Sequence, residues 1–162
     1  MKSSVRATRF ALVAAALVLA AIPMFAATTA TLALSGTVAP ITQISLSADP
    51  NASALPVGTA TTDMKIASVT EISNDKAGYS VTLSSLNGSM LKEANGSDTL
   101  TYTLNYGGNP VSFLGSTATL TNSNVRSGSA SGTTNQLTIS FPAAFLNADS
   151  YSDTLTFTIT GN

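Results

Sequence analysis

Apolar and polar residues alternate along most of the chain beyond residue 30. The clearest run, residues 100–106, reads Leu-Thr-Tyr-Thr-Leu-Asn-Tyr, and residues 151–160 read Tyr-Ser-Asp-Thr-Leu-Thr-Phe-Thr-Ile-Thr. Because successive side chains of a strand point to opposite faces, a period of two indicates a strand with one buried face. Both runs therefore predict strands, the first with two tyrosines and two leucines directed inward.

Shorter runs of the same kind predict further strands, and turn-forming residues separate them. These runs cover residues 31–38, 41–46, 64–72, 79–83, 111–114, 118–120 and 136–141. The alternation slips near Ala67, which predicts a bulge. Residues 122–135 are rich in Ser, Gly, Thr and Asn, so we expect a mobile surface loop there. Six to eight short strands with regular turns predict an all-β fold, an immunoglobulin-like β-sandwich, over residues 41–162.

The first 26 residues have the order of a secretory signal peptide. Lys2, Arg6 and Arg9 precede an unbroken apolar run at residues 10–22, and small residues follow. That run is shorter than the roughly 20 residues of a membrane-spanning helix. We therefore expect residues 1–26 to be removed, giving a secreted mature chain without a membrane span. Cleavage after Ala30 and a retained anchor are the alternatives.

Composition removes most catalytic chemistry. The chain has no cysteine and no histidine, so neither a Ser–His–Asp or Cys–His hydrolase site nor a usual zinc site can form. After signal cleavage, four basic residues face eight acidic ones, a net charge of −4. A sparse acidic surface argues against nucleic-acid binding, which needs clustered Lys and Arg. We expect no enzyme activity and no cofactor.

Two remaining groups of residues have a functional and a structural interpretation. Asp149 and Asp153 could form the carboxylate pair of a glycosidase, but a solvated pair or a turn cap is the favoured interpretation. Tyr102 and Tyr106 could stack on a sugar. Because both share a face with leucines, we expect them in the core instead.

The strand at residues 31–38 is the candidate functional element. It places Leu32, Leu34, Gly36 and Val38 on one face, and Pro40 separates it from the rest of the chain. In one interpretation it pairs within its own molecule and closes the sandwich. In the other, residues 27–40 form an extension that is donated to a neighbouring subunit. The donated strand would lie beside the last strand of that subunit, at Tyr151, Leu155, Phe157 and Ile159.

The sequence of residues 32–41, Leu-Ala-Leu-Ser-Gly-Thr-Val-Ala-Pro-Ile, resembles the donor-strand extension of chaperone–usher pilins. The resemblance implies that the alternating apolar residues fill pockets of the acceptor, and that Gly36 lies over a pocket too shallow for a large side chain. Residues 74–85, 102–111 and 150–160 extend the likeness. Because cysteine is absent, the closer resemblance is to the colonisation-factor branch, and the last strand is also similar to spore coat protein U-type secreted domains.

The resemblance implies an incomplete sandwich and a structural role. Such a chain would be a subunit of a surface fimbria or pilus, assembled by donor-strand exchange and supporting adhesion or biofilm formation. Its partners would be copies of itself or related pilins, a periplasmic chaperone and an outer-membrane usher, and it would reach the cell surface through the periplasm. The alternative is a self-contained secreted immunoglobulin-like module or coat protein that binds carbohydrate or protein.

Overall fold

The computed structural model describes residues 28–162, and the signal peptide predicted at residues 1–26 lies outside them. The chain divides into two units, with the boundary between Gly36 and Thr37. Residues 28–40 contain no helix or strand. Among the described residues, no helix is long and apolar enough to cross a membrane.

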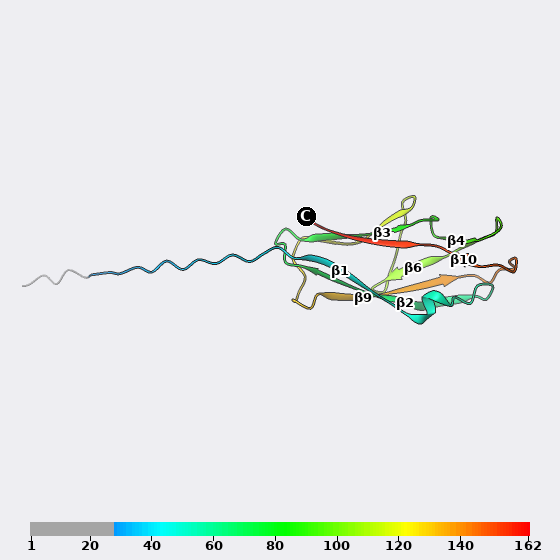
Figure 1. Ribbon diagram of the computed structural model, residues 1–162, viewed down its shortest axis with the longest axis horizontal. Coiled ribbons are helices and arrows are strands. Elements are labelled where there is room, and N and C mark those ends of the chain that lie inside the picture. The colour runs from blue at the N-terminus through cyan, green and yellow to red at the C-terminus, as the bar shows by residue number, and fades with distance from the viewer. Residues whose placement is uncertain (1–27) are drawn as a thin grey trace, which may run out of the picture. The chain divides into compact units, whose positions relative to one another are not determined.

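Residues 42–161 fold into antiparallel strands with one short 3₁₀ helix (Figure 1). Asp49 caps the N-terminus of the helix η1 (Pro50–Ser53), and its carboxylate accepts a hydrogen bond from the Asn51 backbone N–H. The strands are β1 (Thr42–Ala48), β2 (Thr61–Ser73), β3 (Tyr79–Ser85), β4 (Met90–Glu93), β5 (Thr99–Thr101), β6 (Thr103–Tyr106), β7 (Asn109–Pro110), β8 (Thr117–Ser123), β9 (Thr133–Phe141), β10 (Tyr151–Ser152) and β11 (Leu155–Gly161).

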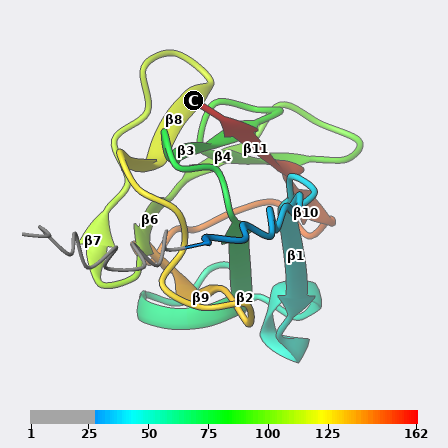
Figure 2. The same cartoon turned by 90° about the vertical axis from the view of Figure 1, so that its left-hand side faces the viewer.

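The strands form three antiparallel sheets that share one core. The largest has the order β1-β2-β9-β6-β7, and the other two have the orders β11-β3-β8 and β10-β4-β5. Seen from one end, β8, β3 and β11 lie over the sheet that contains β9, β2 and β1 (Figure 2). This arrangement agrees with the predicted all-β class and with a β-sandwich. The shared core contains Ile66, Val69, Leu83, Leu91, Leu100, Tyr102, Leu104, Tyr106, Leu137, Ile139 and Phe141.

The alternating pattern predicted the core correctly in the central strands. Val81 and Leu83 of β3 are fully buried, and both predicted core tyrosines, Tyr102 and Tyr106, are buried as well. The bulge predicted near Ala67 is confirmed, because the pairing of β2 with β9 shifts register between Lys65 and Ala67. An extra residue at this point lets the long strand follow the twist of the sheet.

The run at residues 100–106 was predicted as one strand, but the structure divides it. β5 pairs with β4 in one sheet and β6 pairs with β9 in another, so the chain changes sheets at Tyr102. The alternation continues through the change, because both strands face the same core. The inward side chains therefore stay buried although their hydrogen-bonding partners differ.

The prediction of a strand at residues 111–114 is wrong. Gly107 and Gly108, both with positive φ, turn the chain into the short β7 instead, and Leu114 forms only an isolated bridge with Thr117. Val111 and Phe113 still pack against the core, but from a loop. Apolar residues at alternate positions can serve a loop that covers a core, which explains the incorrect prediction.

The loop predicted at residues 122–135 is too long. β8 continues to Ser123, and β9 already begins at Thr133, which pairs with Glu71 of β2. Between them, Ser127 is buried and donates a hydrogen bond of 3.0 Å to the Ser73 carbonyl. Polar residues at both ends of this segment extend the strands because their backbone groups pair within the sheets.

Candidate functional site: an open groove between two edge strands

The first and last strands of the folded unit are both edge strands. Within the described residues, β1 pairs with β2 and β11 pairs with β3, and neither has a partner on its other edge. β1 and β11 lie next to each other in space, but no hydrogen-bonded ladder joins them. Each strand therefore leaves a row of backbone N–H and C=O groups free to pair with an added strand.

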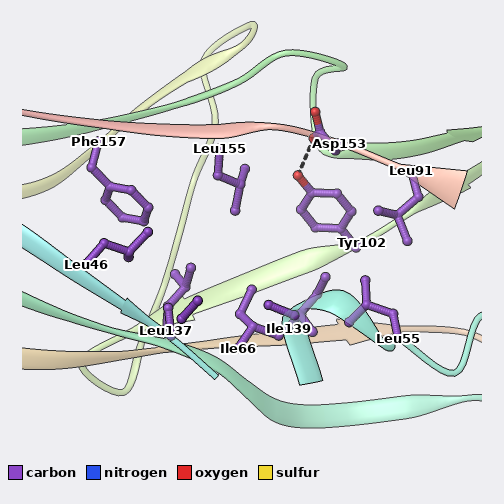
Figure 3. Close-up of a pocket in the computed structure, with 13 residues that line it drawn as sticks. Leu46, Leu55, Ile66, Leu91, Tyr102, Leu137, Ile139, Asp153, Leu155 and Phe157 are labelled. Carbon is purple, nitrogen blue, oxygen red and sulfur yellow. Dashed lines mark hydrogen bonds between the residues drawn. The ribbon is translucent and has the colours of Figure 1, made fainter. Parts of the chain in front are cut away.

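A largely apolar groove of about 190 Å³ lies between these two strands (Figure 3). Leu46 of β1 faces Phe157 of β11, and Ile66 and Ile139 lie on the opposite side of the groove from Leu155. The complete lining comprises Leu46, Ala48, Ala52, Leu55, Ile66, Ala67, Leu91, Tyr102, Leu137, Ile139, Asp153, Leu155 and Phe157. Except for Tyr102 and Asp153, these side chains offer only apolar surface.

The strands that flank the groove are less buried than their neighbours. Leu155 and Phe157 of β11 remain half-buried, although they alternate inward in the same way as the fully buried Val81 and Leu83 of β3. Leu46 of β1 is 54% exposed. Each of these side chains would lose solvent exposure if another strand lay between β1 and β11, and burying apolar area is stabilising.

The structure brings together only part of the predicted acceptor residues. Leu155 and Phe157 line the groove, as predicted for the last strand. Ile159 is half-buried on the same face of β11 but lies outside the groove lining, and so does Tyr151. Tyr151 belongs to β10, which pairs with β4, and its hydroxyl donates to the Asn147 carbonyl at 3.1 Å.

The predicted donor residues are exposed. Leu32, Leu34 and Val38 are 84%, 88% and 84% exposed, and a Cβ atom added at Gly36 would meet no atom within 4 Å. In the described chain, residues 31–38 are paired with no strand. Three large apolar side chains in this short segment are thus largely exposed.

Sequence reasoning did not identify the groove residues contributed by other strands. Leu46, Ile66 and Leu91 come from three different strands, and Leu55 comes from the loop after η1. Which core positions stay accessible depends on which strand edges remain unpaired. The sheet order determines which strand edges are unpaired, and no short stretch of the sequence reveals it.

Asp153 is the one charged residue of the groove lining, and its carboxylate is held by four donors. It accepts hydrogen bonds from the Tyr102 hydroxyl at 2.5 Å and the Ser85 hydroxyl at 2.6 Å. The backbone N–H groups of Asn87 and Thr154 donate at 2.9 and 2.7 Å. Asp153 lies between β10 and β11, where the single strand predicted at residues 151–160 is interrupted.

These hydrogen bonds control the ionisation of the carboxyl. Burial is the largest single influence and raises the pKa of Asp153, but the bonds from Ser85, Tyr102, Asn87 and Thr154 together outweigh it, so the pKa is lowered. Burial, followed by the hydrogen bond to Asp153, raises the pKa of Tyr102 well above its usual value. The pair is therefore a carboxylate and a protonated phenol at neutral pH.

Asp149 and Asp153 do not form one pair, but the turn-cap interpretation holds for Asp149, which accepts from the backbone N–H groups of Asn95 and Ser150. Asp149 accepts from the backbone and side chain of Asn95, at 2.9 and 3.1 Å, whereas Asp153 accepts from β3, Tyr102 and the turn after β3. No donor is common to both carboxylates among the described hydrogen bonds. Asp149 joins two loops, and Asp153 is part of the structure at the end of the groove.

A second buried carboxylate was not identified from the sequence. Glu71 of β2 is 1% exposed and accepts hydrogen bonds from the Tyr106 hydroxyl and, at 2.9 Å, from Thr121. Its other oxygen, Oε2, has no partner among the described residues. A signal was present, because a buried tyrosine hydroxyl needs an acceptor, and the bulge near Ala67 shifts Glu71 to the inward face.

No group of three or more His, Cys, Asp or Glu side chains in residues 28–162 is arranged to hold a metal ion. The candidate site is an apolar groove with one well-bonded carboxylate at its end, between two strand edges that are unpaired within residues 28–162. It is suited to accept an extended peptide through backbone pairing and alternate side chains.

Comparison with protein-family models and with curated proteins found no match for this chain.

Proposed function

We propose that this chain is a structural subunit of a surface fimbria, assembled when each subunit inserts its extension into the groove of a neighbour. One observation carries the proposal. The same chain has an apolar groove between two unpaired strand edges and an exposed segment with apolar residues at every second position. Groove and segment are complementary in chemistry and in period, which is the requirement for strand addition.

The sheet order supports an immunoglobulin-like sandwich that lacks its last strand. In their order across the largest sheet, β1, β2, β9 and β6 match the arrangement A-B-E-D of one immunoglobulin sheet, and β3 and β11 correspond to C and F of the other. In that fold strand G pairs with the free edge of F. Here β11 has no such partner among the described residues, and the groove lies at this edge.

The inserted segment would be stabilised by two kinds of interaction. Burial of Leu32, Leu34 and Val38 contributes about 1.5–3 kcal/mol for each side chain. Each backbone hydrogen bond of the added ladder contributes about 0.5–1.5 kcal/mol net. Ordering of a flexible segment opposes these terms, but their sum favours a long-lived connection between subunits.

The same features imply assembly partners. Unpaired strand edges beside an apolar groove promote aggregation when they are exposed. A subunit that crosses the periplasm in this state therefore needs a chaperone that covers the groove, and an outer-membrane usher at which the chaperone is replaced by the next extension. These two partners follow from the proposed incomplete fold and from the resemblance to chaperone–usher pilins.

A synthetic peptide tests whether the groove accepts the extension. We expect a peptide of residues 28–40 to bind the mature chain, to raise its Tm by several degrees and to inhibit its self-assembly. At 100 times Kd, such a ligand stabilises the folded state by about 2.7 kcal/mol. Thermal melts and size-exclusion chromatography over a peptide titration provide the two measurements.

The matched control is the same peptide with Leu34→Asp, which places a charge on the apolar face. It should change neither the Tm nor the assembly. If both peptides act alike, or if neither acts, the groove does not accept this segment. That result would favour the self-contained secreted module over a fimbrial subunit.

A further inference from the structure

Asn74 holds the base of the extension with three hydrogen bonds. Its side-chain Nδ2 donates to the Ala39 carbonyl at 2.8 Å, and its Oδ1 accepts from the Ile41 N–H at 2.7 Å. Its own backbone N–H donates to the Ile41 carbonyl at 3.0 Å. One asparagine therefore contacts polar backbone groups on both sides of Pro40.

These contacts continue the ladder between β1 and β2 beyond its last regular pair, Thr42 and Ser73. The main chain leaves the sheet after Asn74, where Gly78 N–H donates to the Asp75 carbonyl in a turn. No further backbone of β2 is then present to pair with Ala39. The carboxamide has one acceptor oxygen and an N–H donor, as a peptide group does, and it takes the place of the missing peptide.

This arrangement affects the direction in which residues 39–41 run. They are bonded on the β2 side of β1, whereas the groove lies on the opposite edge of β1, beside β11. For residues 31–38 to enter the groove of their own subunit, the chain must reverse immediately before Thr42. That reversal requires Ala39 and Ile41 to leave Asn74 and to lose these hydrogen bonds.

Insertion of the extension into the groove of its own subunit has a large advantage over insertion into a second copy, so assembly needs a feature that opposes it. A segment attached by a short linker has an effective concentration in the millimolar range at its own binding site. Each extension would therefore fill the groove of its own subunit in preference to that of a second copy. Assembly between subunits depends on a feature that makes the internal route unfavourable.

We infer that Asn74 is a positioning residue that keeps each extension out of the groove of its own subunit and so directs it to a second copy of the chain. This inference rests on the proposed function, because it has meaning only if the groove accepts the extension. It adds a residue outside both groove and extension that decides between a closed monomer and a polymer.

The test compares the mature wild-type chain with Asn74→Ala and with Asn122→Ala, a control at an exposed asparagine of β8. Limited proteolysis reports whether residues 31–38 are protected, and it is repeated over a hundredfold range of protein concentration. For wild type and Asn122→Ala, protection should rise with concentration, because a second molecule supplies the groove. For Asn74→Ala, protection should persist at the lowest concentration, and polymer should fall at least fivefold.

The Asn74→Asp variant provides a second test if the alanine variant folds poorly. It keeps an acceptor for the Ile41 N–H but places an oxygen against the Ala39 carbonyl, so it should behave as Asn74→Ala does. The inference is overturned if either folded variant keeps the concentration dependence of wild type, or if wild type is protected at every dilution. Failure of the proposed function looks different, because then no protein protects the extension at any concentration.

Discussion

Replacing Gly36 with leucine should prevent assembly of the mature chain while leaving the subunit folded. A Cβ atom added at this position meets no atom within 4 Å, so we expect the substitution to leave the isolated subunit folded. In the proposed assembly, Gly36 would lie between Leu34 and Val38 on the face that enters the groove. Extra volume in a filled apolar site costs about 1–3 kcal/mol, which weakens insertion by roughly 5- to 150-fold.

Gel electrophoresis without boiling, which preserves polymers as a ladder, measures this effect. Ser35→Leu is the matched control, because it adds a leucine to the neighbouring position on the opposite face of the inserted strand. This control should form the wild-type ladder, and Gly36→Ala should be close to wild type. An unchanged ladder from Gly36→Leu would exclude this face of the extension as the inserted surface.

Replacing Asp153 with alanine should give the largest loss of stability among single substitutions near the groove, about 3 kcal/mol. The carboxylate accepts from the Tyr102 and Ser85 hydroxyls and from two backbone N–H groups. Removing it leaves the buried Tyr102 hydroxyl without this acceptor, and hydrogen bonds to charged groups contribute about 1.5–3 kcal/mol. Urea unfolding followed by circular dichroism measures the change.

Two further measurements separate this network from a general effect of charge. Asp149→Ala removes a carboxylate that joins two loops outside the groove lining, and it should lower the unfolding midpoint much less than Asp153→Ala does. Because the pKa of Asp153 is lowered in the folded protein, its contribution is present above the pKa of the unfolded chain, and it disappears as the pH falls through the lowered value. The difference between wild type and Asp153→Asn should therefore shrink on acidification. A difference that does not change with pH would show that ionised Asp153 is not the stabilising form.

The strand pattern was predictable wherever a strand has one buried face. The alternation at β3 identified Val81 and Leu83, and the slip at Ala67 identified the bulge of β2. In both places the burial of alternate side chains dominates the local free energy, and that preference is visible in the sequence. The same reasoning correctly placed Tyr102 and Tyr106 in the core.

Pairing partners were not predictable from the same pattern. The change of sheet at Tyr102 keeps the inward face, so β5 and β6 read as one strand although their partners are β4 and β9. Residues 133–135 read as loop because they are polar, yet they extend β9 beside β2. Backbone hydrogen bonds decide these features, and they depend on the neighbouring strand more than on the identity of the side chain.

The groove illustrates the same limit for the candidate site. Leu155 and Phe157 were expected at the acceptor edge, whereas Leu46 and Leu55 on the other side became evident only from the sheet order. The bonds of Asn74 with Ala39 and Ile41 were also hidden, because they join residues more than 30 positions apart. The alternating pattern of residues 31–38 is visible in the sequence, whereas the groove proposed to receive them depends on the sheet order.

Disulfide cross-linking between two molecules tests the central claim, namely that the extension of one subunit lies beside β11 of another. The chain has no cysteine, so any disulfide joins introduced residues. A Ser35→Cys chain is mixed with a chain carrying one cysteine at an exposed position of β11, Thr156, Thr158 or Thr160, and Thr119→Cys on β8 is the control. The account predicts a cross-linked dimer with at least one β11 variant and none with Thr119→Cys. No dimer with any β11 variant, together with a disulfide inside single chains that carry both cysteines at high dilution, would contradict it.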